Sequence, residues 1–298
     1  MENNTEPTKR KSLDKPPVDE SVVDKEIEEI FGKAPMAEEP LSQTLDKFIV
    51  ATSKSKVAVI VPMFGYWNDV KDCYLDADII SATLNRVSSH AHSLYAIVVA
   101  EPERIPQDVA QEITKKNIGG NVKGVRMPVG STYGEYVCKG MEVAMEETDA
   151  AYFIVLNPWV IIQQNGIDTL VDRVNLDNYA PVVCGYDLRG ELTPDQFVSY
   201  SANTPREKLM LNFNFIGLQR FVAEMAVLDH NFKTRVFLER DFFQTINSKG
   251  YHAISSERVP IFSFDVPWDE YVPREWYEED KAYFEKKWGF APANIKYE

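Results

Sequence analysis

Short hydrophobic runs recur along the chain from Lys56 onward, and amphipathic segments separate them. Four runs of the first half lie at residues 56–64, 94–102, 121–128 and 151–158, and helical patterns lie at 69–86, 106–117 and 133–147. Apart from the short run at 121–128, these runs are almost continuously apolar, as expected for strands that are buried on both faces. Strands that alternate with helices of this length indicate right-handed βαβ crossovers. The pattern therefore predicts an α/β fold with a mostly parallel central sheet and helices on both faces.

The alternation weakens after residue 165. Apolar runs at 179–188 and 210–218 predict two more strands, 250–266 predicts two short β segments, and helical patterns lie at 219–228, 238–249 and 275–290. No Gly-x-Gly-x-x-Gly fingerprint follows the first strand, which argues against a Rossmann-type dinucleotide site. We expect the second half to extend the first and to shape a cleft against it.

The first 48 residues differ in texture from the predicted domain at 49–298. Residues 1–20 are rich in charge and proline and hold few apolar side chains, so they are predicted to be disordered. Residues 21–31 form a short amphipathic helical pattern, with Val23, Ile27 and Phe31 on one face. A lone helix of about three turns is marginal in water. It therefore packs on its own domain, on a partner protein or on a second copy.

The charge balance and the cysteines narrow the class of protein. The net charge is −14, with 46 acidic residues against 32 basic ones, which argues against a broad nucleic-acid surface. Cys73, Cys138 and Cys184 lie far apart without a Cys-x-x-Cys spacing, so we expect free thiols in a reducing compartment. The apolar runs are too short to span a membrane, and the polar N-terminus does not resemble a signal peptide. The expected location is cytoplasmic.

Several polar residues stand where chemistry is expected. Glu101 directly follows the second strand, at the sheet edge where α/β proteins bind ligands. Glu239 and Asp241 lie in the apolar stretch FLERDFF, which suits either a buried general base or acids at a helix N-terminus. Arg126, Tyr133 and Lys139 surround the third strand and the helix after it, where a diphosphate would be met, although surface charge also explains Lys139. The pair His90 and His92 is too little for a metal site.

The stretch FIVLNPWVII, residues 153–162, delivers Asn157 and Trp159 to the same sheet edge. An apolar run that stops at Asn-Pro is typical of a buried strand that ends at the rim of a sheet. A tryptophan is unexpected there, because such turns usually carry a small or acidic residue.

Segments from about 55 to 290 resemble the family 2-type GT-A glycosyltransferases. VAVIVPMFGYWNDVKDCY is similar to their opening strand and helix, and the stretch 124–162 is similar to their middle section, in which a helix with Gly140 and Ala144 precedes the strand ending in Asn-Pro. LDHNFKTRVFLERDFFQTINSKGYHAI resembles their later acidic segment, and YFEKKWG also recurs in such enzymes. The resemblance implies a GT-A fold and a nucleotide-diphosphate sugar as donor.

The resemblance also assigns roles to residues. It places Pro62, Phe64 and Glu101 at the base and ribose of the donor, and Asn157 and Trp159 beside the donor phosphates. It makes Glu239 the base that deprotonates the acceptor hydroxyl for an inverting attack. Asp241 would then orient the acceptor or the base.

Trp159 departs from the family pattern, because the resemblance implies an aspartate that binds a divalent metal at this position. An indole does not bind Mg²⁺ or Mn²⁺, which take oxygen ligands, and Asn157 alone is a poor substitute. We therefore expect no metal ligand and no required cofactor, with Lys139 as the nearest cation for the diphosphate. Two functions stay open: a glycosyltransferase with an unknown acceptor, or an inactive GT-A domain that serves as an interaction module docked through residues 21–31.

Overall fold

The computed structural model describes residues 56–64, 83, 85–100, 122–176, 180–201, 207–208, 211–264 and 273–291. All of them belong to the second of the chain's two units, Ala51–Glu298. The predicted tail at 1–48, the helix at 106–117, Glu101 and Cys73 lie outside the described residues, as does most of the helix at 69–86. No described helix combines the length and the hydropathy that crossing a bilayer requires.

The described elements begin with three strands, and helices follow from α5 onward. In chain order they are β1 (Lys56–Pro62), β2 (Ser93–Ala100), β3 (Val122–Arg126), α5 (Tyr133–Glu147), β4 (Tyr152–Leu156), β5 (Val160–Ile162), α6 (Gly166–Leu176), β6 (Val182–Asp187), α7 (Pro194–Val198), β7 (Glu207–Lys208), β8 (Phe215–Gln219), α8 (Arg220–Met225), α9 (Arg235–Ser248), β9 (Ala253–Ser263) and α11 (Arg274–Trp288).

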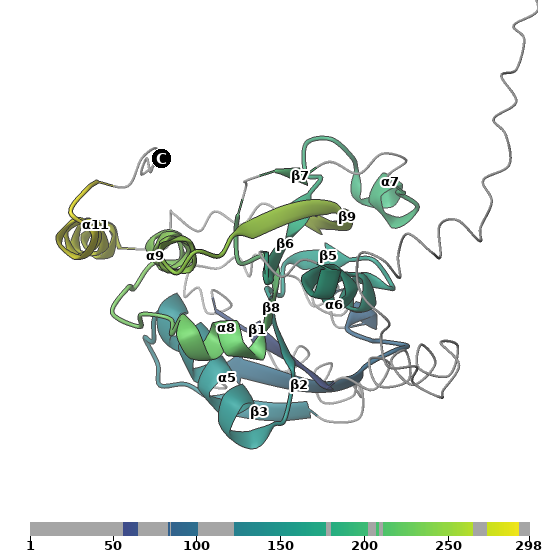
Figure 1. Cartoon of the computed structure of the whole chain (residues 1–298), viewed down its shortest axis with the longest axis horizontal. Helices are drawn as coiled ribbons and strands as arrows, with labels where there is room; N and C mark the ends of the chain where they lie inside the picture. The colour runs from purple at the N-terminus through teal and green to yellow at the C-terminus, as the bar shows by residue number, and fades with distance from the viewer. Residues whose placement is uncertain are drawn as a thin grey trace, which may run out of the picture. The chain divides into compact units, whose positions relative to one another are not determined.

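The described strands form one sheet in the order β3-β2-β1-β4-β8-β6-β9-β5, and β7 also pairs with β9 (Figure 1). β1 pairs in parallel with β2 and β4, β2 with β3, and β6 with β9. β8 is antiparallel to both of its neighbours, β4 and β6. The predicted α/β fold with a mostly parallel sheet is confirmed.

Helices cover both faces of this sheet, as the alternating side chains of β8 show. Gly217 faces α6 so closely that a Cβ atom there would lie 2.8 Å from Cγ of Leu170. Ile216 and Leu218 point to the opposite face, where they line a small pocket with residues of α5 and α8. Successive residues of a strand point to opposite faces, so α6 lies on one face and α5 with α8 on the other.

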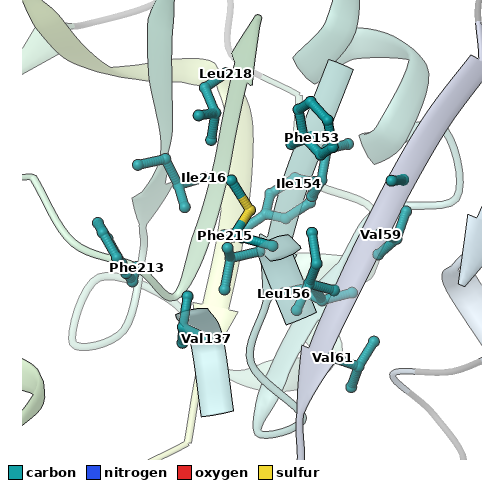
Figure 2. Close-up of a cluster of buried hydrophobic side chains, with 14 of the residues drawn as sticks. Val59, Val61, Val137, Phe153, Ile154, Leu156, Phe213, Phe215, Ile216 and Leu218 are labelled. Carbon is teal, nitrogen blue, oxygen red and sulfur yellow. The ribbon is translucent and has the colours of Figure 1, made fainter. Parts of the chain in front are cut away.

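The core lies between these layers. The strands β1, β4 and β8 contribute continuous runs of buried side chains, and Figure 2 shows part of this cluster, including Ile154, Ile216 and Val137 of α5. α5 sits unusually close to β1, because a Cβ atom at Gly140 would lie 2.3 Å from Cγ2 of Ile60. The chain therefore needs glycine at this position.

β9 differs from its prediction. The sequence predicts two short β segments in residues 250–266, but the structure has one strand of 11 residues. Its pairing with β6 jumps from Gly185↔Ser256 to Tyr186↔Pro260, which leaves Glu257, Arg258 and Val259 outside the register. This bulge keeps one strand continuous where the sequence pattern looks interrupted.

Candidate functional site

Asn157 joins three parts of the chain just beyond the end of β4. Its Oδ1 accepts a hydrogen bond from the Tyr133 hydroxyl at 3.2 Å, and its Nδ2 donates to the Phe213 carbonyl at 3.0 Å. Its backbone N–H donates to the Asn214 carbonyl at 2.9 Å. Burial raises the pKa of Tyr133 well above its ordinary value, so this hydroxyl stays a neutral donor. Asn157 is fully buried, and both ends of its amide have protein partners.

Trp159 fills the space directly after this turn. Its side chain is 1% exposed, and its carbonyl accepts a hydrogen bond from the Phe264 N–H at 3.0 Å. The guanidinium of Arg235, on α9, lies over the indole with Cζ 5.9 Å from the ring centroid. This is the geometry of a cation–π contact. A large aromatic residue and a cation thus stand where the resemblance implies a carboxylate and a metal.

Glu239 lies one helical turn after Arg235 and pairs with it. Arg235 Nε is 2.5 Å from Glu239 Oε1, and the Phe213 N–H donates to the same oxygen at 2.8 Å. Neither Oε2 of Glu239 nor the two terminal nitrogens of Arg235 have a hydrogen-bond partner among the described residues. Both side chains keep some exposure, 12% for Glu239 and 19% for Arg235. Each residue therefore has one part fixed by the protein and one part available to a ligand.

Arg235 keeps its positive charge in this setting. Burial by itself would lower its pKa, but the Glu239 carboxylate, with Tyr133 and Asp187 nearby, outweighs burial and raises the pKa of Arg235 above its ordinary value. The electrostatic influence of Tyr133 and Asp187 indicates that α5 and the end of β6 lie near this part of α9. A permanent cation and a carboxylate thus share one partly buried place.

Several predicted site residues come together at this edge of the sheet. Phe64, just past the end of β1 at Pro62, is buried and packs edge-to-face on Tyr133 and Tyr136, with ring centroids 5.7 and 5.5 Å apart. Tyr133 is hydrogen-bonded to Asn157, Asn157 is hydrogen-bonded to the Phe213 carbonyl, and the Phe213 N–H is hydrogen-bonded to Glu239. Contacts therefore connect Phe64, Asn157 and Glu239 directly or through one residue, and Arg235 connects Glu239 to Trp159.

Two other predicted residues lie elsewhere. Asp241 is buried against α11, where its carboxylate accepts hydrogen bonds from Lys287 Nζ and Trp288 Nε1, both at 2.9 Å. Two helical residues span about 200° of rotation, so Asp241 and Glu239 face different sides of α9. Lys139 is exposed on α5 and pairs with Glu142 at 3.0 Å.

Arg235 was not among the residues that the sequence singles out. Its spacing of four from Glu239 is a readable signal for a helical ion pair. Nothing in the sequence pattern indicates that it also stacks on Trp159. The roles of Tyr133 and Phe213 as links in the network likewise depend on contacts between distant segments.

The residues at this edge do not suit a divalent metal. Among the residues that the structure describes, no group of three or more His, Cys, Asp or Glu side chains could hold a metal ion. The indole of Trp159 offers no oxygen, and the amide of Asn157 is engaged with Tyr133 and Phe213.

This topology is the GT-A fold, which solved structures of glycosyltransferases share. One is a mannosyltransferase, PcManGT from Pyrobaculum calidifontis, in complex with GDP-Man and Mn²⁺; it matches with a TM-score of 0.50 and 12% identity over 79% of this chain. Another is TarS from S. aureus, with a TM-score of 0.51 and 10% identity over 82% of this chain. The match covers 65% of the mannosyltransferase and 40% of TarS, less than two thirds of either.

At such identities the likeness concerns the fold. No protein-family model matches the chain, and no curated protein matches it by sequence.

Proposed function

We propose that this chain is a family 2-type glycosyltransferase that binds a nucleotide-diphosphate sugar at the edge formed by Phe64, Asn157, Trp159 and Arg235. The observation that carries the proposal is the Arg235–Glu239 pair. It offers a carboxylate oxygen and two guanidinium nitrogens that have no hydrogen-bond partner among the described residues, at the sheet edge where ligands of α/β proteins bind. The fold supports the same class of function by analogy.

Glu239 is the proposed general base. Its Oε1 is held by Arg235 and by the Phe213 N–H, so the carboxylate is oriented while Oε2 is available. Oε2 takes the proton of the acceptor hydroxyl as the hydroxyl oxygen forms its bond to the anomeric carbon. The bond from that carbon to the diphosphate oxygen breaks, and the nucleoside diphosphate leaves with the bonding electrons. Attack from the opposite side inverts the anomeric configuration. A positioned base of this kind contributes about 10²- to 10⁴-fold in rate.

Arg235 is the proposed partner of the donor diphosphate. A planar guanidinium binds phosphate oxygens through paired hydrogen bonds, and Arg235 has both terminal nitrogens for this task. Trp159 supports the guanidinium from one side, and Glu239 fixes its Nε. We assign the neutralising charge to this side chain because the donor set does not suit a metal. Lys139, which the sequence proposes for the same role, pairs with Glu142 on the exposed side of α5.

The inactive interaction module is the second candidate, and one observation favours it. Trp159 is 1% exposed and already in contact with Arg235, so its indole occupies space at the site that the family gives to a metal ligand. Under this proposal the ion pair of α9 is structural, and residues 21–31 dock on a partner protein.

Calorimetry on the full chain separates the two functions. The titrants are GDP-mannose, UDP-glucose and UDP-N-acetylglucosamine, each with and without a chelator. We expect at least one to bind and to bind equally well in the chelator. Arg235→Gln should weaken that binding about 10- to 100-fold, the loss of one or two charge-assisted hydrogen bonds.

Two further variants complete the design. Glu239→Gln keeps the size of the side chain, so it should retain donor binding and lose transfer. Lys139→Ala tests the sequence proposal directly and should leave binding within about twofold, because an exposed pair contributes little. No binding by any of the three titrants, with a folded protein, supports the interaction module. Binding that the chelator abolishes contradicts the role of Arg235.

A further inference from the structure

A polar pocket lies near the C-terminal end of β5, at the opposite end of this strand from Trp159. β5 begins at Val160 and is followed by Gln163, so the pocket starts about 13 Å along the chain from Trp159, at roughly 3.3 Å per residue. Figure 1 shows β5, β9, α6 and α7 around this part of the sheet. The cavity volume is about 330 Å³. It is lined by the residues that follow β5, by the start of α6, by the residues after α7 and by the β9 bulge.

The β9 bulge creates one wall of this pocket. Glu257 and Arg258 are two of the three residues that the β6 pairing skips, and Pro260 is the point where pairing resumes. Bulges redirect side chains and recur next to functional sites. Both Glu257 and Arg258 of the bulge are among the residues that line the pocket.

The wall is built from hydrogen bonds that fix its side chains. Gln163 Nε2 donates to the Tyr200 carbonyl at 2.7 Å and also reaches the Phe197 carbonyl at 3.4 Å. The Tyr200 hydroxyl bonds to Glu257 Oε1. Glu257 is 4% exposed, so this carboxylate belongs to the interior of the wall. The pocket is therefore held open in a defined shape before any ligand binds.

Arg258 is the lining residue with an uncommitted charge. It is exposed, and its guanidinium has neither a hydrogen bond nor an ion pair with the described residues. The chain as a whole carries 46 acidic residues against 32 basic ones. A cation without an acidic partner in so acidic a protein is available to an external anion.

The remaining lining has the chemistry of a sugar site. The side-chain amide of Asn165 supplies a donor and an acceptor, Oε1 of Gln163 and the hydroxyl oxygen of Thr169 supply acceptors, and Tyr200 adds an aromatic ring. The volume is at the lower end of the range of about 300–1,000 Å³ for small-molecule sites, which suits one ring rather than a long chain. We propose that this pocket binds a single sugar ring that carries an anionic group, either a carboxylate or a phosphate.

The proposed site shares no residue with the edge at Arg235 and Glu239, and it does not depend on the function proposed there. Arg258 would pair with the anionic group, while the amide and hydroxyl groups of the other lining residues bind the ring hydroxyls. In an enzyme that modifies carbohydrate, such a site would bind a charged sugar unit of the substrate away from the atoms that react.

The test uses the full chain and four defined probes: glucuronate, glucose 6-phosphate, methyl glucoside and inorganic phosphate. Ligand-observed NMR and calorimetry measure their affinities. We expect at least one of the two anionic sugars to bind with a dissociation constant of about 1 mM, as befits a small ligand. The other two probes should bind at least about tenfold more weakly, since each lacks either the charge or the ring. Which of the two sugars is preferred distinguishes carboxylate from phosphate recognition.

Three variants locate the binding. Arg258→Gln should weaken the preferred anionic sugar about tenfold, and Tyr200→Phe should also weaken it, because Glu257 loses the hydrogen bond from the Tyr200 hydroxyl. Arg240→Gln is the matched control, since Arg240 is an exposed arginine on α9, and it should change nothing. Unfolding curves confirm that each variant is folded.

Four results would overturn the proposal. The first is an absence of binding by both anionic sugars at 20-fold the expected constant (about 20 mM), and the second is an unchanged affinity in Arg258→Gln. The third is inorganic phosphate binding as tightly as the preferred anionic sugar. The fourth is displacement of the sugar by GDP-mannose together with its loss in Arg235→Gln. The last result would place the sugar at the Arg235 edge. If the chain does not bind nucleotide sugars, the function proposed for the Arg235 edge is wrong but this proposal is not affected. The two sites are tested with different probes.

Discussion

Asp241 should act as an anchor for the C-terminal helix, and its removal should destabilise the fold. Its carboxylate is 2% exposed by side chain and accepts hydrogen bonds from Lys287 and Trp288, both on α11. Lys287 also pairs with Asp229 at 2.8 Å, and Tyr283 donates to Asp229 at 3.0 Å. Asp241→Ala would leave the Trp288 N–H without its acceptor and Lys287 with one carboxylate in place of two.

The magnitude follows from these contacts. Breaking a buried ion pair costs about 3–5 kcal/mol, and a hydrogen bond to a charged group contributes about 1.5–3 kcal/mol. Lys287 is 31% exposed by side chain and keeps Asp229, so the loss lies toward the low end. We expect Asp241→Ala to lower the free energy of unfolding by about 2–4 kcal/mol. Most of this should come from the docking of α11 on α9.

Urea unfolding measures the total change, and hydrogen exchange locates it. The midpoint should fall, and amide exchange should accelerate in Arg274–Trp288 more than in α5. Arg240→Ala, an exposed neighbour on the same helix, is the control and should stay within about 0.5 kcal/mol of the wild type. A change of less than about 0.5 kcal/mol in Asp241→Ala, with sugar transfer abolished, would refute the anchor and support the catalytic role that the sequence suggests.

Two further predictions concern Trp159 and Cys138. Trp159→Asp should lower the free energy of unfolding by about 3–5 kcal/mol. The new carboxylate would face Arg235, so electron paramagnetic resonance should find Mn²⁺ binding as weak as in the wild type, although the resemblance implies a metal-binding aspartate at this position. Submillimolar Mn²⁺ binding by the variant would contradict this. Burial raises the pKa of Cys138 to about 12, so iodoacetamide at pH 8 should modify it about 10³-fold more slowly than free cysteine, which peptide mapping can measure. Rapid modification of the folded protein would show that this thiol is not shielded.

The sequence by itself determined the class of fold. Runs such as VAVIV and YFIVL are apolar at nearly every position, as expected for strands covered on both faces, and the structure buries almost all of their side chains. Gly140 was also readable as part of a family-like pattern, and the structure explains it by the close approach of Ile60. Where the pattern was interrupted, as at Glu257 to Val259, local reasoning split one strand into two, because a bulge hides its continuity.

Only the tertiary structure decided which polar residues meet. Glu239 and Asp241 look equivalent in FLERDFF, but the turn of α9 points one to Arg235 and the other to α11. The links of the candidate site join residues that are 24, 26 and 56 positions apart: Tyr133 to Asn157, Phe213 to Glu239, and Asn157 to Phe213. Hydrophobic periodicity indicates which face of a helix or strand is buried. It does not indicate which residues of other elements contact that face. Those contacts are fixed by the packing of whole helices and strands.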